Sequence, residues 1–220
     1  MSTSEPLILA FDTSAAHCAA ALLSGDRVLA EALEPMGKGQ AERLMPLIAE
    51  VIADGGRTLE DLDAIGVGIG PGNFTGIRIS VSAARGLALA LGIPAVGVSM
   101  LEARALDTPH PSLVSVDARR DHLYLQRFGP GADLGPDLVA MNAVAAWACP
   151  GLSVTGDRAE EIAAVLGATP MPCPDNPTPA IARLAAARFR DPALPRPAPL
   201  YLRAADAAPA RDGGPMILPR

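Results

Sequence analysis

An apolar strand pattern that ends in an aspartate occurs twice in this chain, at Leu9–Asp12 and again 105 residues later at Val114–Asp117. At the same offset His17 falls on His122, and each histidine stands five residues after its aspartate, where the next strand pattern begins. Matches of a few residues arise by chance, but here the order strand, aspartate, tight turn, strand repeats with them. The repeat predicts a chain built from two copies of one structural unit.

The first copy opens with three strand patterns. Apolar residues dominate Leu7–Phe11, Cys18–Leu23 and Val28–Leu33. A turn at residues 24–26 (SGD) separates the last two, and its glycine adopts positive φ freely, as a hairpin requires. The pattern predicts an antiparallel meander of three strands.

Helices and further strands complete this copy. Over Gln40–Ile52 apolar residues recur at intervals of three and four, as on one face of a helix. Pro46 interrupts the range, so we expect the true helix start to be later than residue 40. A buried-type strand over Ala64–Ile69, a helix over Thr75–Leu91 and a strand over Pro94–Val98 follow.

The second half repeats the same order, with a strand at Leu152–Thr155 and a helix from Arg158. Two βββαβα units predict a duplicated α/β architecture of two small subdomains, as in actin, sugar kinases and heat-shock ATPases. We place the N-terminal subdomain at 1–102, the C-terminal subdomain at 103–205 and a loose tail at 206–220. Twelve of the 22 prolines lie after residue 169. We therefore expect neither helix nor inner strand in 170–179 or 192–199.

Composition limits the class of protein. No apolar run reaches about 18 residues and the start, 1–6, is polar and acidic, so we predict neither a membrane span nor a secretory signal. Cys18, Cys149 and Cys173 are widely spaced, which suits the cytoplasm and argues against a zinc site. The formal charge of −6 disfavours unaided binding of nucleic acid.

The most specific stretch is Gly66–Arg78 (GVGIGPGNFTGIR), in which four alternating glycines lead from a strand into a helix. Free N–H groups of such a turn, together with a helix N-terminus, can hold an anion. No Gly-Lys-Ser/Thr follows, so this is not a Walker loop, and the spacing does not fit a dinucleotide fingerprint. Close packing of strand against helix is the alternative, and the sequence leaves both open.

The turn after the first strand is Asp12-Thr13-Ser14. Proteins of the actin-like group use an aspartate there to orient a metal-bound phosphate, but the glycine that usually admits the phosphate is missing here. The alternative is that Asp12 and Ser14 only bond the N–H groups of their own turn. The candidate residues of a vestigial nucleotide or anion site are Asp12, Ser14, Gly70, Gly72, Thr75 and Asp117.

The helix over Thr75–Leu91 has two kinds of face. One carries four polar residues within roughly 80° of one another, namely Thr75, Arg78, Ser82 and Arg85. Another carries small and apolar residues, so we expect burial on two sides, against its own sheet and against either a partner or the rest of the monomer. The candidate partner-interface residues on this helix and the preceding one are Leu44, Ile48, Val51, Ile77, Ser80, Val81, Ala83, Ala84 and Leu87.

Residues 70–99 (GPGNFTGIRISVSAARGLALALGIPAVGVS) closely resemble the signature of the TsaB family. LILAFDTS, AERLMPLI, VDARRDHLY and PLYLR also fall in family order, so the resemblance covers most of the chain. This family comprises accessory subunits of bacterial tRNA threonylcarbamoyladenosine synthesis. It is similar to TsaD, the catalytic subunit, and the resemblance implies the same duplicated fold.

The resemblance also shows what this chain lacks. TsaD-like proteins follow the equivalent of Val96–Val98 with two metal-binding histidines four residues apart, where this chain has Met100 and Arg104. Of the glycine-rich adenine-binding sequence only a hint remains, at Thr155–Asp157. Many TsaB chains have a histidine where Gln40 stands, so we attach no chemistry to that position.

The resemblance implies a scaffold with no catalytic residue, cofactor or metal site of its own. It would bind TsaD through the helices at about 40–54 and 75–91, form a homodimer through the same surface, and support the ATPase TsaE. ATP and a metal ion would belong to the partner subunits. The complex transfers threonylcarbamoyl to the adenosine next to the anticodon, and this cytoplasmic chain would meet tRNA only through it. We expect Ala83→Glu and Leu44→Glu to abolish partner binding without unfolding.

The main alternative is a free-standing ATPase or kinase of the actin-like fold. It would use Asp12, Asp117 and the turn Gly70–Gly72 in a cleft between the repeats, and ATP binding by the chain alone would favour it. A metallopeptidase is disfavoured because no HExxH motif is present, and a serine or cysteine hydrolase because GxSxG is missing. The basic segment 176–220 is either a solvated tail or an aid to tRNA contact.

Overall fold

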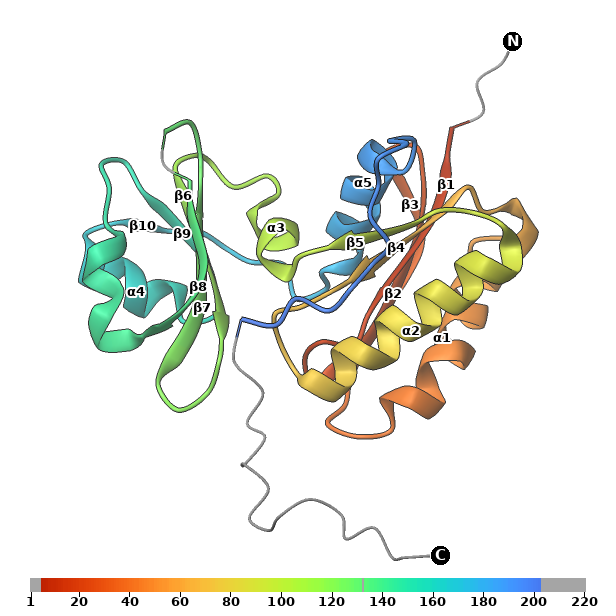
Figure 1. Ribbon diagram of the computed structural model, residues 1–220, viewed down its shortest axis with the longest axis horizontal. Helices are drawn as coiled ribbons and strands as arrows, with labels where there is room; N and C mark the ends of the chain where they lie inside the picture. Colours follow the sequence, from red (N-terminus) through yellow and green to blue (C-terminus); the bar gives the residue numbers. More distant parts are fainter. Residues whose placement is uncertain (1–4, 132, 203–220) are drawn as a thin grey trace, which may run out of the picture.

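The computed structural model describes residues 5–131 and 133–202, which form two lobes, each built on one five-stranded sheet (Figure 1). The first sheet has the order β3-β2-β1-β4-β5 and the second the order β8-β7-β6-β9-β10. In both, three strands form an antiparallel meander and two more run parallel to its first strand. This repetition confirms the duplicated α/β fold. The strands are β1 Leu7–Asp12, β2 His17–Ser24, β3 Arg27–Pro35, β4 Ala64–Gly68, β5 Ala95–Val98, β6 Ser112–Asp117, β7 His122–Phe128, β8 Leu134–Ala140, β9 Ser153–Gly156 and β10 Thr169–Pro170.

Helices follow the strands in the same order in both halves. The first half contains α1 Gln40–Asp54, the 3-10 turn η1 Leu59–Asp61, α2 Phe74–Leu91 and α3 Met100–Ala105. The second contains the 3-10 helix η2 Met141–Trp147, α4 Ala159–Leu166 and α5 Thr178–Arg188. The short η2 stands where the first half has the 15-residue α1.

β1 is buried along its whole length because helices cover both faces of the first sheet. Leu9 and Phe11 pack in one core cluster with α1 and α2, whereas Ile8 and Ala10 pack in another with α3 and α5. The alternation follows from the two-residue period of a strand. A third cluster fills the second lobe around Trp147.

The two halves exchange their last helices. α3 follows β5 of the first sheet but packs on β6, β7 and β9 of the second. α5 follows β10 of the second sheet but packs on β1, β2 and β4 of the first. Residues 103–205 therefore do not all belong to the second lobe, because α5 and the chain after it return to the first. The expected tail, 206–220, lies outside the described residues.

Two expectations about proline need correction. α1 begins at Gln40, and Pro46 lies inside it, because the helix is held by buried side chains at Leu44, Leu47 and Ile48. α5 forms within a proline-rich region, since Pro179 occupies the first turn, where its missing N–H has no helical partner to lose. Ile181, Ala182 and Ala185 of α5 are completely buried.

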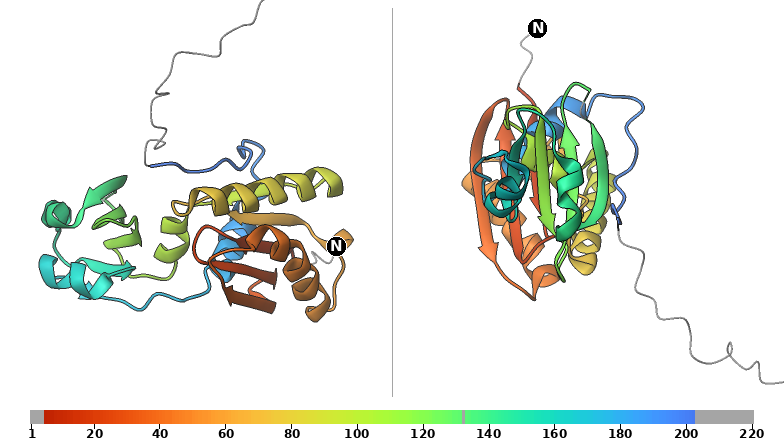
Figure 2. Two further views of the ribbon diagram at one scale, coloured as in Figure 1. Left: turned by 90° about the horizontal axis from the view of Figure 1, so that it is seen from below. Right: turned by 90° about the vertical axis from the view of Figure 1, so that its left-hand side faces the viewer.

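Residues 189–202, here called the strap, run beside α2 (Figure 2). Leu200 N–H donates to the Ile69 carbonyl (2.8 Å), and the Tyr201 ring stacks on Phe74 with centroids 5.0 Å apart. The strap therefore forms a wall along one flank of α2.

α2 is the helix that bears on the expectation of no membrane span. The helix has 18 residues with a mean hydropathy of 1.2, so its length and composition alone would allow it to cross a membrane. A single such helix is weak evidence, because core helices pass the same test. α2 buries Ile77, Val81 and Ala84 over the first sheet.

Candidate functional site

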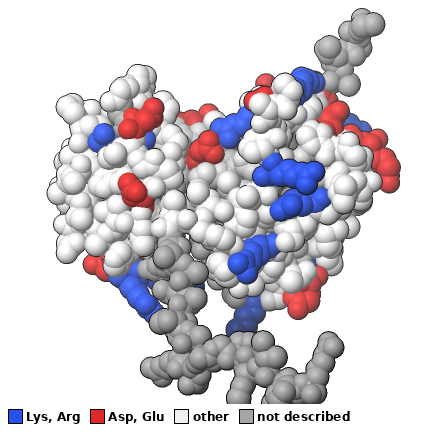
Figure 3. Space-filling view, in the orientation of Figure 1, with Lys and Arg blue, Asp and Glu red and all other residues white. Residues whose placement is uncertain are grey.

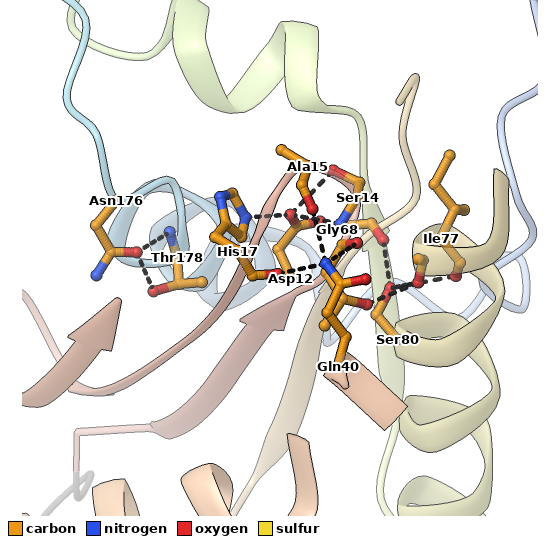
Figure 4. Close-up of polar contacts among 12 residues, drawn as sticks. Asp12, Ser14, Ala15, His17, Gln40, Gly68, Ile77, Ser80, Asn176 and Thr178 are labelled. Carbon is orange, nitrogen blue, oxygen red and sulfur yellow. Dashed lines mark hydrogen bonds and ion pairs between the residues drawn. The ribbon is translucent and has the colours of Figure 1, made fainter. Parts of the chain in front are cut away.

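The turn after β1 is organised by the carboxylate of Asp12, which is fully buried (Figure 4). Its Oδ2 accepts hydrogen bonds from the N–H and hydroxyl of Ser14 (2.9 Å each) and lies 2.8 Å from Nε2 of His17. Its Oδ1 is buried and has no hydrogen-bond partner among the described residues. The predicted bonding of Asp12 and Ser14 within their own turn is therefore observed.

The glycine-rich turn packs directly onto this first turn. A Cβ on Gly72 would lie 2.3 Å from the Ser14 carbonyl oxygen, and one on Gly76 would lie 1.9 Å from that of Thr13. The N–H of Asn73 donates to the Ser14 carbonyl (2.6 Å), and the Thr13 hydroxyl donates to the Gly76 carbonyl (2.6 Å). These glycines thus permit close packing, which is the alternative that the sequence left open.

The N-terminus of α2 is partly satisfied within the protein. The side chain of Asn73 caps the helix by accepting the N–H of Gly76 (2.9 Å), while Thr75 is exposed in the first turn. A Cβ on Gly70 would lie 2.5 Å from Ile77, so Gly70 is also a packing position. Asp12, Ser14, Gly70 and Gly72 come together around the two turns.

Gln40 is a residue of this site that the sequence reasoning missed. Its Nε2 donates to the carbonyls of Ala15 and His17 (2.7 Å each) and approaches that of Thr13 (3.3 Å). One amide at the start of α1 thereby holds the whole β1–β2 turn. A buried polar residue at a helix start would have been the signal, but burial is not readable from the sequence.

Asp117 lies apart from this cluster in the second lobe. It is exposed, its N–H donates to Asp157 (2.8 Å), and its Oδ1 accepts the N–H of Arg119 (3.3 Å). The β6–β7 pairing matches Asp117 with Leu123, whereas β1–β2 pairs Asp12 with Ala19. The second hairpin is therefore one residue shorter.

This difference of one residue in hairpin length gives the two histidines, His17 and His122, different contacts. A one-residue shift turns a strand side chain to the other face of the sheet. His122 accordingly contacts the carbonyl of Arg120 (Nδ1 to O, 2.8 Å) rather than Asp117. His122 therefore corresponds to His17 in sequence position but does not share the contact that His17 makes with aspartate.

The positions of the metal-binding histidines of TsaD-like proteins serve packing here. Met100 is buried in α3, and Arg104 bonds the Ser115 carbonyl (2.9 Å) and forms an ion pair with Asp157 (3.0 Å). Arg104 thereby ties α3 to the second sheet. Within residues 5–131 and 133–202, no three His, Cys, Asp or Glu side chains are grouped to hold a metal ion.

The predicted partner face is mostly inside the monomer. Seven of its nine residues are at most 3% exposed and belong to the core: Leu44, Ile48, Val51, Ile77, Ser80, Val81 and Ala84. Their apolar side chains face the first sheet, so they are not available on the free surface. Ala83 and Leu87 are partly buried at the edge of the same cluster.

Other side chains of the same helices are exposed. Met45 of α1 is 44% exposed and Leu89 of α2 is 85% exposed. Met45 lines a small apolar groove of about 200 Å³ with Ala49 and Ile52. Arg85 and Leu89 line a larger groove of about 660 Å³ between α2 and the strap.

A family model described as "TsaD: tRNA N6-adenosine threonylcarbamoyltransferase" matches residues 34–197. An uncharacterized protein of Mycobacterium tuberculosis (strain ATCC 25618 / H37Rv) is 39% identical over 207 residues, 92% of this chain and 94% of the relative. The tRNA threonylcarbamoyladenosine biosynthesis proteins TsaB of Escherichia coli and Bacillus subtilis are 34% and 41% identical. Each of these two alignments covers 53% of this chain and 52% of the TsaB protein.

Solved structures agree with these relatives. YeaZ from Pseudomonas aeruginosa is 27% identical with a TM-score of 0.66, over 90% of this chain and all of YeaZ. Component A of the (R)-2-hydroxyglutaryl-CoA dehydratase of Acidaminococcus fermentans shares the fold, with a TM-score of 0.55, 11% identity and coverage of 84% of this chain and 99% of that one. The matched family, the named relatives and the shared fold place this chain in the TsaB family, within the wider TsaD family.

Proposed function

We propose that this chain is a non-catalytic accessory subunit in the synthesis of threonylcarbamoyladenosine in tRNA. Its relatives named TsaB support the pathway, and the packing of the two turns supports the accessory role. A phosphate bound at the glycine-rich turn would need the space that the carbonyl groups of Thr13 and Ser14 occupy, and the N–H that Asn73 donates to Ser14. This closed contact is the observation that carries the proposal.

The proposed partner is TsaD, which supplies the catalytic site together with ATP and a metal ion, while TsaE is the further ATPase of the complex. TsaD would dock on the outer side of α1 and α2. Met45 and the partly buried Ala83 are the side chains we assign to that contact, because both are apolar groups that α1 and α2 leave at least partly accessible. A homodimer of this chain through the same side would compete with TsaD. The proposed location is the cytoplasm.

The proposal is tested by calorimetric titration of TsaD from the same organism into this chain. We expect saturable binding with a negative heat-capacity change, since apolar surface is buried. Reconstituted threonylcarbamoyl transfer should require this chain. Absence of binding, with or without ATP and TsaE, would contradict the accessory role.

A titration of ATP into the chain alone distinguishes the ATPase or kinase alternative from the accessory role. We expect no binding at micromolar ATP, because the first turn is closed by internal hydrogen bonds. Micromolar binding that Asp12→Asn abolishes would favour the alternative.

A further inference from the structure

Three arginines lie along the flank of α2 that faces the strap: Arg78 and Arg85 of α2 and Arg196 of the strap itself. Arg78 and Arg85 are seven residues apart, so they lie on the same flank of the helix, about 10 Å apart along its axis. Arg196 of the strap lines the 660 Å³ groove together with Arg85. Figure 3 shows basic side chains in a row across the face that carries α2 and the strap. We call Arg78, Arg85 and Arg196 the arginine flank.

The charge of the arginine flank is not neutralised locally. Five arginines elsewhere, Arg43, Arg104, Arg158, Arg183 and Arg188, form ion pairs with Asp or Glu. In the described part of the chain, no carboxylate lies within 4.0 Å of the flank's guanidinium nitrogens. Asp191, the acidic residue that lines the groove, accepts the N–H of Ala193 (2.8 Å).

Aromatic rings accompany this charge. The Arg78 guanidinium lies 3.8 Å from the centroid of the Phe74 ring and donates to the Tyr201 hydroxyl (2.8 Å). Phe74 and Tyr201 nevertheless remain 46% and 44% exposed. Arginine beside a half-exposed aromatic ring offers a phosphate contact next to a surface on which an unpaired base can stack.

Within residues 5–131 and 133–202 these three arginines form no ion pair, although the chain has a net charge of −6. A linear row suits a polyanion with regularly spaced charges better than it suits a single carboxylate. We propose that the arginine flank binds the phosphate backbone of tRNA, with Phe74 and Tyr201 beside it to receive an unpaired base. This inference rests on the proposed function, in which tRNA is the substrate of the complex, and assigns part of the tRNA contact to this chain.

The test compares Arg85→Ala/Arg196→Ala with the parent chain in complex with TsaD. The probe is an unmodified tRNA transcript with adenosine next to its anticodon, and filter binding gives Kd across a range of salt concentrations. We expect the double variant to bind tRNA about tenfold or more weakly. The plot of log K against log salt should become shallower, with its negative slope reduced in magnitude by about two. Arg27→Ala is the control, because Arg27 is exposed on β3, at the opposite edge of the first sheet, and has no ion-pair partner among the described residues.

Size-exclusion chromatography of each complex separates the explanations. An unchanged slope and affinity would overturn the inference. A second outcome would also overturn it: the double variant no longer binds TsaD, and its remaining tRNA binding depends on salt as that of the parent does. The flank would then be a protein interface. Failure of the parent chain to bind TsaD would instead contradict the proposed function. In that case the role of the arginine flank is tested by titrating tRNA into the parent chain and into the double variant without TsaD. We expect the same difference in salt dependence between the two chains.

Discussion

The Cα of Gly68 lies against the buried carboxylate of Asp12, so closely that a Cβ on Gly68 would stand 2.0 Å from Oδ1 and 2.8 Å from Cγ. β4 and β1 are parallel neighbours in the first sheet, and this contact lies where both strands end. A glycine at this point of β4 therefore fixes the position of the carboxylate that holds the first turn.

We expect Gly68→Ala to lower the free energy of unfolding by about 1–3 kcal/mol, because the added methyl group overpacks a rigid site. Urea denaturation measures the change. Gly86→Ala is the matched control: a Cβ there meets nothing within 4 Å, and in a helix the change should stabilise by about 0.5–1 kcal/mol. Equal effects of the two substitutions would show that contact with Asp12 is not what matters.

Gln40→Ala should destabilise the chain by about 1–3 kcal/mol, because it leaves the carbonyls of Ala15 and His17 without their donor. Gln40→Glu should cost more at pH 7, since a carboxylate would face carbonyl oxygens. Part of that loss should return near pH 4, where the protonated carboxyl can donate. Thermal unfolding at both pH values checks the order, and a Glu variant as stable as the parent at pH 7 would contradict it.

Leu44 and Met45 are neighbours with opposite exposure, 1% and 44%. We therefore expect Leu44→Glu to unfold the chain, in contrast to the expectation from sequence, because it buries a charge in the core. Met45→Glu should leave the fold intact and weaken TsaD binding. Circular dichroism and calorimetric titration separate the two effects. Met45→Glu binding TsaD as tightly as the parent would place the interface elsewhere.

Arg43 ties α1 to β3 through Glu34 (Nε to Oε2, 2.7 Å) and also bonds Glu50 (Nη1 to Oε1, 2.8 Å). Its hydrogen bonds lower the pKa of both carboxyls below the ordinary 4.5. The stabilisation is therefore present above about pH 4.5 and is lost as the pH falls through the lowered pKa values. We expect Arg43→Met to be less stable than the parent at pH 7, with a difference that shrinks in acid. A difference that stays constant down to pH 2 would argue against the ion pairs.

Burial raises the pKa of the Cys18 thiol to about 11. At pH 8 we expect a thiol reagent to label Cys149 and Cys173, which are partly exposed, well before Cys18, because the thiolate is the reacting form. Mass spectrometry of timed samples gives the order, and labelling in denaturant provides the reference. Equal rates for all three cysteines in the native chain would mean that Cys18 is not enclosed.

Much of the first lobe could be predicted because its signals are local. The helix expected over Thr75–Leu91 is observed at Phe74–Leu91, and the strand expected over Ala64–Ile69 is observed at Ala64–Gly68. α5 was missed because its prolines and alanines give a weak pattern. It is held by burial of Ile181 and Ala185 on a sheet that is distant in sequence.

The residues of the candidate site were predicted only in part, since Gln40 was missed and Asp117 lies apart from the cluster. Asp12 and Ser14 do share hydrogen bonds, yet the closeness of Gly68 to Asp12 depends on the pairing of β1 with β4. The helical pattern identified the apolar residues of α1 and α2 but not what they face. Seven of the nine residues assigned to a partner in fact face the protein's own sheet.

The sequence by itself determined the duplicated order of elements, the family and the identity of the two turns, because these depend on residues near one another in the chain. Tertiary structure decided which side chains remain accessible, how α3 and α5 are exchanged, and that Arg78, Arg85 and Arg196 form one row. Such relationships depend on strand register and on packing between distant segments. A shift of one residue, as between His17 and His122, changes them without leaving a signal in the local sequence pattern.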